Sequence, residues 1–310
     1  MHPDLSRRII LIVYPGFELL DMAGPVSVFT KANELAGNQH YRILICSPQG
    51  GKVQCSAGIE VSSQACCTIQ PEVNDTVLVT GAMESWLRPA TQDPEIRALL
   101  LAAASHAERY GSVCSGAFVL GAAGLLRGKQ AATHWLAKDR LQTTFPDSNT
   151  ATDALFVTDG QLWTSAGVST GIDLALAMLE TDLGSTVAAR VARHLVLYAR
   201  RPGHQSQFSS FLEAQSTRNK DFASLIEWIE ANLSARLRVE QLAEVAGMSI
   251  RTFHRKFTES MRITPARYLA ERKMEWAKQL LEAGHTVKVV TTKTGFASEA
   301  AFRSAFSERY

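Results

Sequence analysis

Short apolar runs, each followed by a longer stretch with helical periodicity, fill the first two hundred residues of the chain. Apolar residues stand at successive positions in these runs, so a strand formed by any of them is buried on both faces. The runs are residues 8–14, 41–47, 76–80 and 112–114. A hairpin is expected at residues 154–165, around Asp159-Gly160. The helical stretches are residues 22–36, 93–109, 115–126, 170–182 and 185–199. This alternation predicts an α/β fold, a flavodoxin-like parallel sheet sandwiched by helices.

The character of the chain changes after residues 200–217, RRPGHQSQFSSFLEAQST, which we interpret as a linker. Every later segment has a helical pattern, so we expect a domain over residues 1–199 and an all-α domain over residues 218–310. Residues 217–310 carry 16 Lys and Arg against 11 Asp and Glu, a net charge of +5, and the remainder carries −3. The basic excess is typical of a module that meets a polyanion, and solvated helix faces alone would also produce it.

Composition excludes several classes of protein. In 310 residues, 46% are hydrophobic and 20% charged, which is typical of a folded chain with a sizeable core. The longest nearly uncharged apolar run, residues 116–126, is shorter than the roughly 18 residues of a membrane helix. The N-terminus lacks the apolar region of a signal peptide, so we expect a cytoplasmic protein without a membrane partner. Five cysteines without zinc or disulfide spacing predict reduced thiols, and neither a metal nor a cofactor is predicted.

An internal repeat organises the C-terminal region. Gly247 and Gly295 lie 48 residues apart, and each ends a short helical segment, residues 239–246 or 287–294. A serine suited to cap a helix follows each glycine, at Ser249 and Ser298, and a pair of phenylalanines four residues apart follows each serine. Both copies therefore predict a helix, a glycine-containing turn and a second helix, which is the helix-turn-helix unit.

The sequence around this repeat resembles the AraC/XylS family of bacterial transcription regulators over about the last 90 residues. The resemblance is carried by GMS with FHRKF at residues 247–257 and by PARYLAER at residues 265–272. It implies two helix-turn-helix units joined by a long helix, with each second helix in the major groove of double-stranded DNA. The long helix, residues 266–283, has 18 residues and spans roughly 27 Å, near the ~34 Å between successive grooves. Family members usually continue beyond the point equivalent to Tyr310, so either the sequence is shortened or its last helix is incompletely packed.

The second helix of each unit supplies the residues expected to contact DNA. Phe253 and Phe257 share the face that we expect in the core. Arg251 and Arg255 share another face, and a bidentate arginine–guanine contact contributes about 1–3 kcal/mol, so these two are the first candidates for base reading. A single such helix would as readily be a solvated face, but the duplication favours DNA binding. The DNA-binding candidates are Arg251, Thr252, His254 and Arg255 in the first copy and Glu299 and Arg303 in the second.

Four candidate site elements follow predicted strands of the N-terminal region. They contain Asp21, Gly81, Cys114 and residues 164–167. Because ligands bind beyond the carboxyl ends of parallel strands, we expect these elements to converge. The order strand, Cys-Ser-Gly, helix is that of a nucleophile elbow, in which the helix N-terminus favours the thiolate. A small buried cysteine at a tight turn would give the same pattern.

These motifs, with ATHWLAKD at residues 132–139, resemble the ThiJ/PfpI branch of the class I glutamine amidotransferase-like superfamily over about residues 7–199. The resemblance implies that Cys114 is the elbow cysteine, that Asp21 hydrogen-bonds it and that His134 lies nearby. It also implies that Gly81 and the backbone N–H of Ser115 form an anion or oxyanion pocket. These five residues are the ligand-binding candidates, and Cys114, Asp21 and His134 are the candidates for catalysis.

Departures from the superfamily reduce the case for an enzyme. Peptidase-like members place histidine after the elbow cysteine, where this chain has Ser115, and glutaminases use a late His-x-Glu pair. Here such a pair, His106 and Glu108, precedes Cys114, so we expect no glutaminase activity. Fusion to an AraC-type module implies a non-enzymatic regulator with an unidentified small-molecule effector, a homodimeric state and a possible contact with RNA polymerase. The alternative is a cysteine-dependent hydratase or hydrolase, similar to the isocyanide hydratases, with an accessory DNA-binding module.

Overall fold

The computed structural model describes residues 6–150, 154–197, 200–203, 207, 220–233, 235, 237–261, 263–282, 285–296 and 298–309. The chain divides into two compact units, residues 1–207 (the first unit) and residues 208–310 (the second unit). Of the predicted linker, residues 204–206 and 208–217 lie outside the described residues. No helix in the described ranges is long and apolar enough to cross a membrane.

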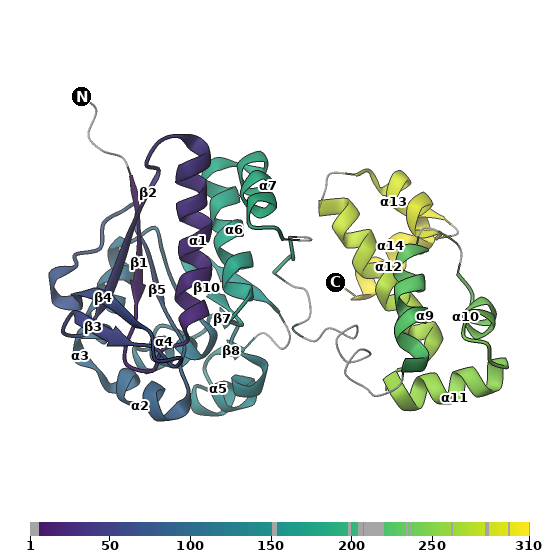
Figure 1. Cartoon of the computed structure of the whole chain (residues 1–310), viewed down its shortest axis with the longest axis horizontal. Coiled ribbons are helices and arrows are strands. Elements are labelled where there is room, and N and C mark those ends of the chain that lie inside the picture. Colours follow the sequence, from purple (N-terminus) through teal and green to yellow (C-terminus); the bar gives the residue numbers. More distant parts are fainter. Residues whose placement is uncertain are drawn as a thin grey trace. The chain divides into compact units, whose positions relative to one another are not determined.

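An eight-stranded sheet forms the centre of the first unit, with the order β3-β4-β2-β1-β5-β6-β10-β9 (Figure 1). The hairpin pairs β3–β4 and β9–β10 are antiparallel, and the other neighbouring strands are parallel. The predicted, mostly parallel sheet is thus confirmed. The strands are β1 Arg7–Ile12, β2 Tyr41–Ser47, β3 Gly51–Gln54, β4 Glu60–Ala65, β5 Thr76–Val79, β6 Arg109–Val113, β9 Phe156–Asp159 and β10 Leu162–Ser165. A small separate sheet pairs β7 Gln130–Ala131 with β8 Asn149–Thr150.

Helices cover both faces of the sheet, which explains why the strands are apolar at every position. In β1, Ile10 and Ile12 belong to one core, whereas Ile9 and Leu11 belong to the other, and all four side chains are fully buried. The first core is closed by α2 Glu84–Gln92, α3 Pro94–His106, α4 Ala117–Ala122 and α5 Lys138–Thr144. The second is closed by α1 Leu19–Ala36, α6 Thr170–Leu183 and α7 Ser185–His194.

Several features of this unit were not predicted. The β3–β4 hairpin lies at the edge of the sheet, where most of its side chains are exposed or half-buried, so it lacks an apolar run. Helix α2 contains Pro89, and α5 is one of the shorter helices. Strand β6 begins at Arg109 rather than residue 112, because the guanidinium of this buried arginine pairs with Asp182 (3.2 Å) and lies over the Trp163 ring (5.4 Å). The charge of Arg109 interrupts the apolar run, so the sequence pattern alone did not place this residue in a strand. The pairing with Asp182 in the folded chain offsets that charge.

All secondary structure in the described part of the second unit is helical. A first core gathers Phe222, Phe253, Phe257 and Tyr268 in a set of edge-to-face rings. A second, smaller core contains Phe302, Val290 and Ala277. The helices are α9 Lys220–Ala231, α10 Val239–Val245, α11 Ile250–Met261, α12 Pro265–Glu282, α13 Val287–Thr294 and α14 Glu299–Arg309.

The repeated helix-turn-helix appears as α10–α11 and α13–α14, joined by α12. Gly247 and Gly295 have φ of 65° and 73°, the left-handed conformation that ends each first helix. The Ser249 hydroxyl accepts from the Thr252 N–H (3.3 Å), and the Ser298 hydroxyl accepts from the Ala301 N–H (3.1 Å). Both predicted serine caps are thus present.

Candidate functional site

Cys114 stands at the carboxyl end of β6 in a left-handed backbone conformation, with φ of 58°. Its carbonyl accepts a hydrogen bond from the Thr133 hydroxyl (3.0 Å), so the loop after β7 is tied to the cysteine. On another side, a Cβ at Gly167 would lie 2.1 Å from the Cys114 Cβ, and Gly167 itself has φ of 93°. Only glycine allows this close approach. The turn after β10 is therefore packed directly against the elbow.

Asp21, in the first turn of α1, is fully buried behind this elbow. One carboxylate oxygen accepts from the Gly81 N–H (2.9 Å), and the other accepts from the Val168 N–H (2.7 Å). Val168 has φ of 52°, an unusual conformation for a β-branched residue. One carboxyl group thus joins the starts of the loops that follow β5 and β10.

The surroundings of Asp21 and Cys114 shift the pKa values of both groups. Burial raises the pKa of Asp21 to about 7, although its two amide bonds act in the opposite direction. Burial, followed by the charge of Asp21, raises the pKa of the Cys114 thiol far above its ordinary value. Hydrogen bonding from Ser115 offsets only part of this increase. Burial and the charge of Asp21 therefore act against the thiolate that the elbow pattern favours.

The backbone donors assigned by resemblance to an anion pocket have other partners here. The Gly81 N–H donates to Asp21, and the backbone N–H of Ser115 hydrogen-bonds the Cys114 sulfur. The Ser115 hydroxyl donates to the Ala82 carbonyl (2.8 Å) and accepts from the Ala82 N–H (2.9 Å). The expected direct bond from Asp21 to the cysteine is replaced by bonds from Asp21 to two backbone amides.

His134 borders the same site from the loop after β7. Its Nδ1 accepts from the Leu136 N–H (3.4 Å), and its ring lies 5.7 Å from the Trp135 ring. Partial burial lowers the pKa of His134, which favours the neutral imidazole. The fold thus brings together the predicted residues from five separate segments of the sequence.

An open pocket of about 460 Å³ lies above Cys114, Ser115 and His134. Glu18 and the ion pair between Glu84 and Arg140 also line it. These three were not predicted, because they occupy helix ends and surface positions without a motif, although Glu18 stands three residues before Asp21. Within the described ranges no group of three His, Cys, Asp or Glu residues is arranged to hold a metal ion. The pocket offers a polar floor and charged walls to a small molecule.

The His-x-Glu pair lies away from this pocket. Glu108 directly precedes β6 and pairs with Arg7 and Arg109, whereas Cys114 directly follows the same strand. His106 is exposed at the end of α3. The five-residue strand separates the pair from the elbow.

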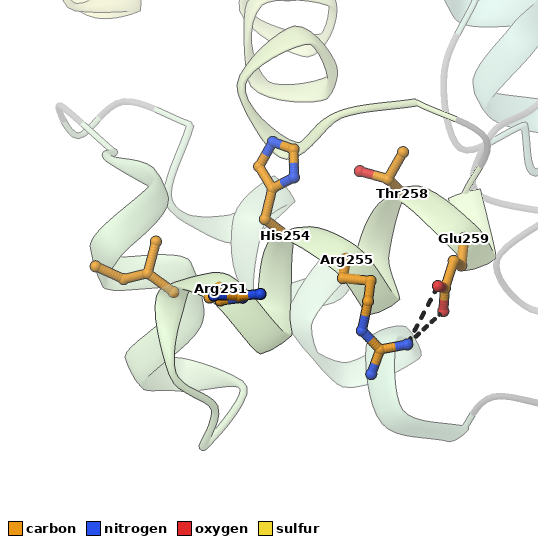
Figure 2. Close-up of a pocket in the computed structure, with 6 residues that line it drawn as sticks. Arg251, His254, Arg255, Thr258 and Glu259 are labelled. Carbon is orange, nitrogen blue, oxygen red and sulfur yellow. Dashed lines mark hydrogen bonds and ion pairs between the residues drawn. The ribbon is translucent and has the colours of Figure 1, made fainter.

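A second candidate surface lies on α11, the second helix of the first helix-turn-helix. Phe253 and Phe257 are fully buried, so the opposite face is directed outward. There the exposed side chains of Arg251, His254 and Arg255 line a shallow hollow of about 720 Å³ (Figure 2). Thr252 is half-buried, and its hydroxyl accepts from Ser249 (2.9 Å), so it is part of the cap rather than of this surface.

Acidic residues accompany the arginines in both copies. Glu259 lies one helical turn after Arg255 in α11. Each of its carboxylate oxygens accepts a 3.1 Å hydrogen bond from the Arg255 guanidinium (Figure 2). In α14, Glu299 and Arg303 form an equivalent pair (3.5 Å) in the reverse order. On both helices an arginine is thus paired with a carboxylate four residues away, and Glu259 was not among the residues predicted from the sequence.

Comparison with known proteins gives two domain matches. The profile of the DJ-1/PfpI family matches residues 7–181, and that of a helix-turn-helix domain matches residues 242–310. The HTH-type transcriptional regulator GbdR of Pseudomonas aeruginosa is 27% identical over 305 residues, which cover 98% of this chain and 82% of GbdR. Isonitrile hydratase of Pseudomonas putida is 30% identical over 204 residues, which cover 65% of this chain and 83% of the hydratase.

A solved structure supports the fold of the first unit. The crystal structure of a ThiJ/PfpI family protein from Pseudomonas syringae is similar with a TM-score of 0.57 and 25% identity. The match covers 78% of this chain and 91% of that protein. The mostly parallel sheet with its flanking helices is therefore shared with that protein.

Proposed function

Because this chain belongs to the DJ-1/PfpI family and carries a helix-turn-helix domain, we propose that it is a sequence-specific DNA-binding transcription regulator. Its family membership concerns residues 7–181, more than half of the chain. Similarity to a transcriptional regulator extends over nearly the whole chain, so both domains occur together in that relative.

The observation that carries this proposal is the outward face of α11. Three exposed basic or imidazole side chains, Arg251, His254 and Arg255, project from a helix whose other face is fixed by two buried phenylalanines. A helix of this kind fits the major groove, where arginine reads guanine and the helix N-terminal half meets the base edges. α14 carries the second such surface, with Glu299 and Arg303.

The test is selection of duplexes from random-sequence DNA by the full-length protein, followed by binding titrations on the selected duplex. Arg251→Ala and Arg255→Ala are each expected to weaken binding about 5- to 100-fold and to reduce discrimination against random DNA. Arg127→Ala is the matched control, because Arg127 is a highly exposed arginine of the first unit. Unchanged discrimination in both variants would contradict base reading by α11.

We propose residues 1–199 as the sensor and dimerisation domain, residues 200–217 as the linker and residues 218–310 as the DNA-binding domain. The pocket at Cys114, Asp21 and His134 takes the small-molecule effector, whose binding changes the pairing of sensor domains in a homodimer and hence the spacing of the DNA-binding domains. RNA polymerase is the proposed partner at promoters. An effector that bound both arrangements equally would change nothing.

An enzymatic role for the same pocket is the second candidate. It is favoured by a carboxylic acid with a pKa of about 7, Asp21, directly behind an elbow cysteine. The raised pKa of the Cys114 thiol lowers its thiolate population and hence its nucleophilic reactivity, which favours sensing. Turnover of an isonitrile by the wild type that is lost in Cys114→Ser would establish the enzyme, and ligand-dependent transcription in the same variant would support sensing.

A further inference from the structure

The segment that leaves the first unit is fastened to it next to the pocket. Arg201 donates from its Nε to the buried carboxylate of Asp173 (3.0 Å), and its backbone N–H donates to the same group (3.3 Å). A guanidinium nitrogen of Arg201 also donates to the Ser169 hydroxyl (3.0 Å). Ser169 directly follows Val168, which lines the pocket and donates to Asp21. Arg201 therefore holds the outer side of the pocket loop after β10.

A second anchor lies at Gln207, the last residue of the first unit. Its side-chain amide donates to the carbonyls of Thr133 (3.1 Å) and Ala154 (2.9 Å). Thr133 is buried, donates to the Cys114 carbonyl and directly precedes His134. Gln207 therefore holds the other pocket loop at Thr133, the same residue that donates to the Cys114 carbonyl and the one directly before His134.

Between these anchors the backbone also docks on the sheet. The Gly203 carbonyl accepts from the Phe156 N–H of β9 (3.1 Å). A Cβ at Gly203 would lie 2.6 Å from the Phe156 carbonyl, so the backbone approach requires glycine. Residues 201–203 and 207, which we call the connector, are thus held by charged, amide and backbone hydrogen bonds.

We propose that the connector reports the state of the pocket to the DNA-binding domain, with Arg201 and Gln207 as the positioning residues. This inference rests on the proposed function and specifies how the pocket is regulated. The two loops that a ligand meets at Val168 and His134 are the loops that Arg201 and Gln207 hold from behind. A ligand that shifts either loop changes the fastening of the connector, from which the second unit continues at residue 208.

Thermodynamic linkage makes this coupling measurable without the effector. If the pocket and the connector are coupled, the coupling free energy acts in both directions. A substitution that releases the connector must therefore also change the conformational equilibrium of the pocket. Cys114 supplies the probe, because this half-buried residue lines the pocket and its carbonyl is held by Thr133. Cys67, an exposed cysteine of the short helix after β4, supplies the reference within the same protein.

The experiment compares full-length Arg201→Lys, Arg201→Ala and Gln207→Ala with the wild type. Arg201→Lys keeps the positive charge opposite Asp173 but loses the planar hydrogen-bonding geometry of the guanidinium. Gln207→Ala removes no charge, so both variants avoid leaving the buried carboxylate unpaired. Arg200→Ala is the matched control, because the neighbouring Arg200 pairs with Glu180 near the far end of α6. The readouts are the iodoacetamide modification rate of Cys114 relative to Cys67 and the affinity for a duplex selected from random DNA.

We expect Gln207→Ala and Arg201→Lys to change the relative modification rate of Cys114 by about threefold or more, because local opening alters access to the pocket. We expect both also to change the affinity for the selected duplex, with Arg200→Ala unchanged in both readouts. The inference would be overturned if the connector variants had the same Cys114 modification rate and DNA affinity as Arg200→Ala. It would also be overturned if they changed the Cys114 modification rate without changing the DNA affinity. Failure of the wild type to select any duplex would instead contradict the proposed function, and the Cys114 rates would still decide whether connector and pocket are coupled.

Discussion

The backbone N–H of Val168 donates a 2.7 Å hydrogen bond to the carboxylate of Asp21, across 147 residues of sequence. Val168 is held there with φ of 52°, although its branched side chain disfavours that region. The same carboxylate binds the Gly81 N–H. Asp21 is therefore the residue that fixes the shape of the pocket floor.

Replacing Val168 with glycine is expected to stabilise the first unit by about 0.5–1 kcal/mol. Glycine relieves a left-handed strain of roughly 1–2 kcal/mol, and its own loss of backbone freedom offsets part of that gain. Val196→Gly, at φ of 57° and 89% exposed, should behave similarly. Val73→Gly, at an exposed turn residue, is the control without a strained backbone. Calorimetric unfolding of the three variants checks this, and a lower melting temperature in Val168→Gly would contradict it.

Asp21 is expected to make stability depend on pH. Its pKa is about 7 in the folded chain against an ordinary 3.8, so the native state binds more protons than the unfolded state between pH 4 and 7. The contribution of Asp21 to the free energy of unfolding therefore falls as pH rises through this window, by at most about 4 kcal/mol. Asp21→Asn does not titrate, and its amide cannot accept from both backbone donors.

Calorimetry of the wild type and Asp21→Asn between pH 4 and 7 measures this contribution, since the other carboxylates cancel in the difference. The stability advantage of the wild type should shrink steadily as pH rises. An advantage that stayed constant or grew with pH would show that Asp21 is ionised in the folded state throughout.

Cys114 is expected to react slowly with iodoacetamide at pH 8, because burial and the charge of Asp21 raise the pKa of its thiol. Exposed Cys67 should be modified faster in the same sample. Asp21→Asn removes a negative charge near the sulfur, and each unit of decrease in pKa increases the thiolate population about tenfold. Peptide-resolved mass spectrometry measures both rates. Equal Cys114 rates in wild type and Asp21→Asn would show that the carboxylate does not act on the thiol.

Glu259 is expected to restrain Arg255 and thereby limit binding to random DNA. Both side chains are 62% exposed, so the pair contributes only about 0.3–1 kcal/mol. Glu259→Gln should therefore strengthen binding to random duplexes about two- to fivefold and make its salt dependence steeper. Glu60→Gln, which breaks the exposed pair with Lys52 in the first unit, is the control. Titrations at several salt concentrations test this, and identical behaviour of the two variants would remove Glu259 from the DNA-facing surface.

Much of the fold follows from the local sequence, because the residues in the apolar patterns are the residues that the fold buries. The continuous apolar run of β1 requires helices on both faces, and Ser249 and Ser298 mark where α11 and α14 begin. The start of β6 at Arg109 could not be predicted in this way. Its buried guanidinium is stabilised by Asp182, which stands 73 residues further along the chain.

The sequence by itself determined Asp21 and Cys114 as candidate pocket residues, because motifs after strands meet at one edge of a parallel sheet, and the family resemblance added His134. Only the tertiary structure decided what these groups are chemically. Burial raises the pKa of the Cys114 thiol and brings the pKa of Asp21 to about 7. Desolvation and hydrogen bonding depend on which distant backbone amides and side chains surround a group, and no local pattern encodes those neighbours.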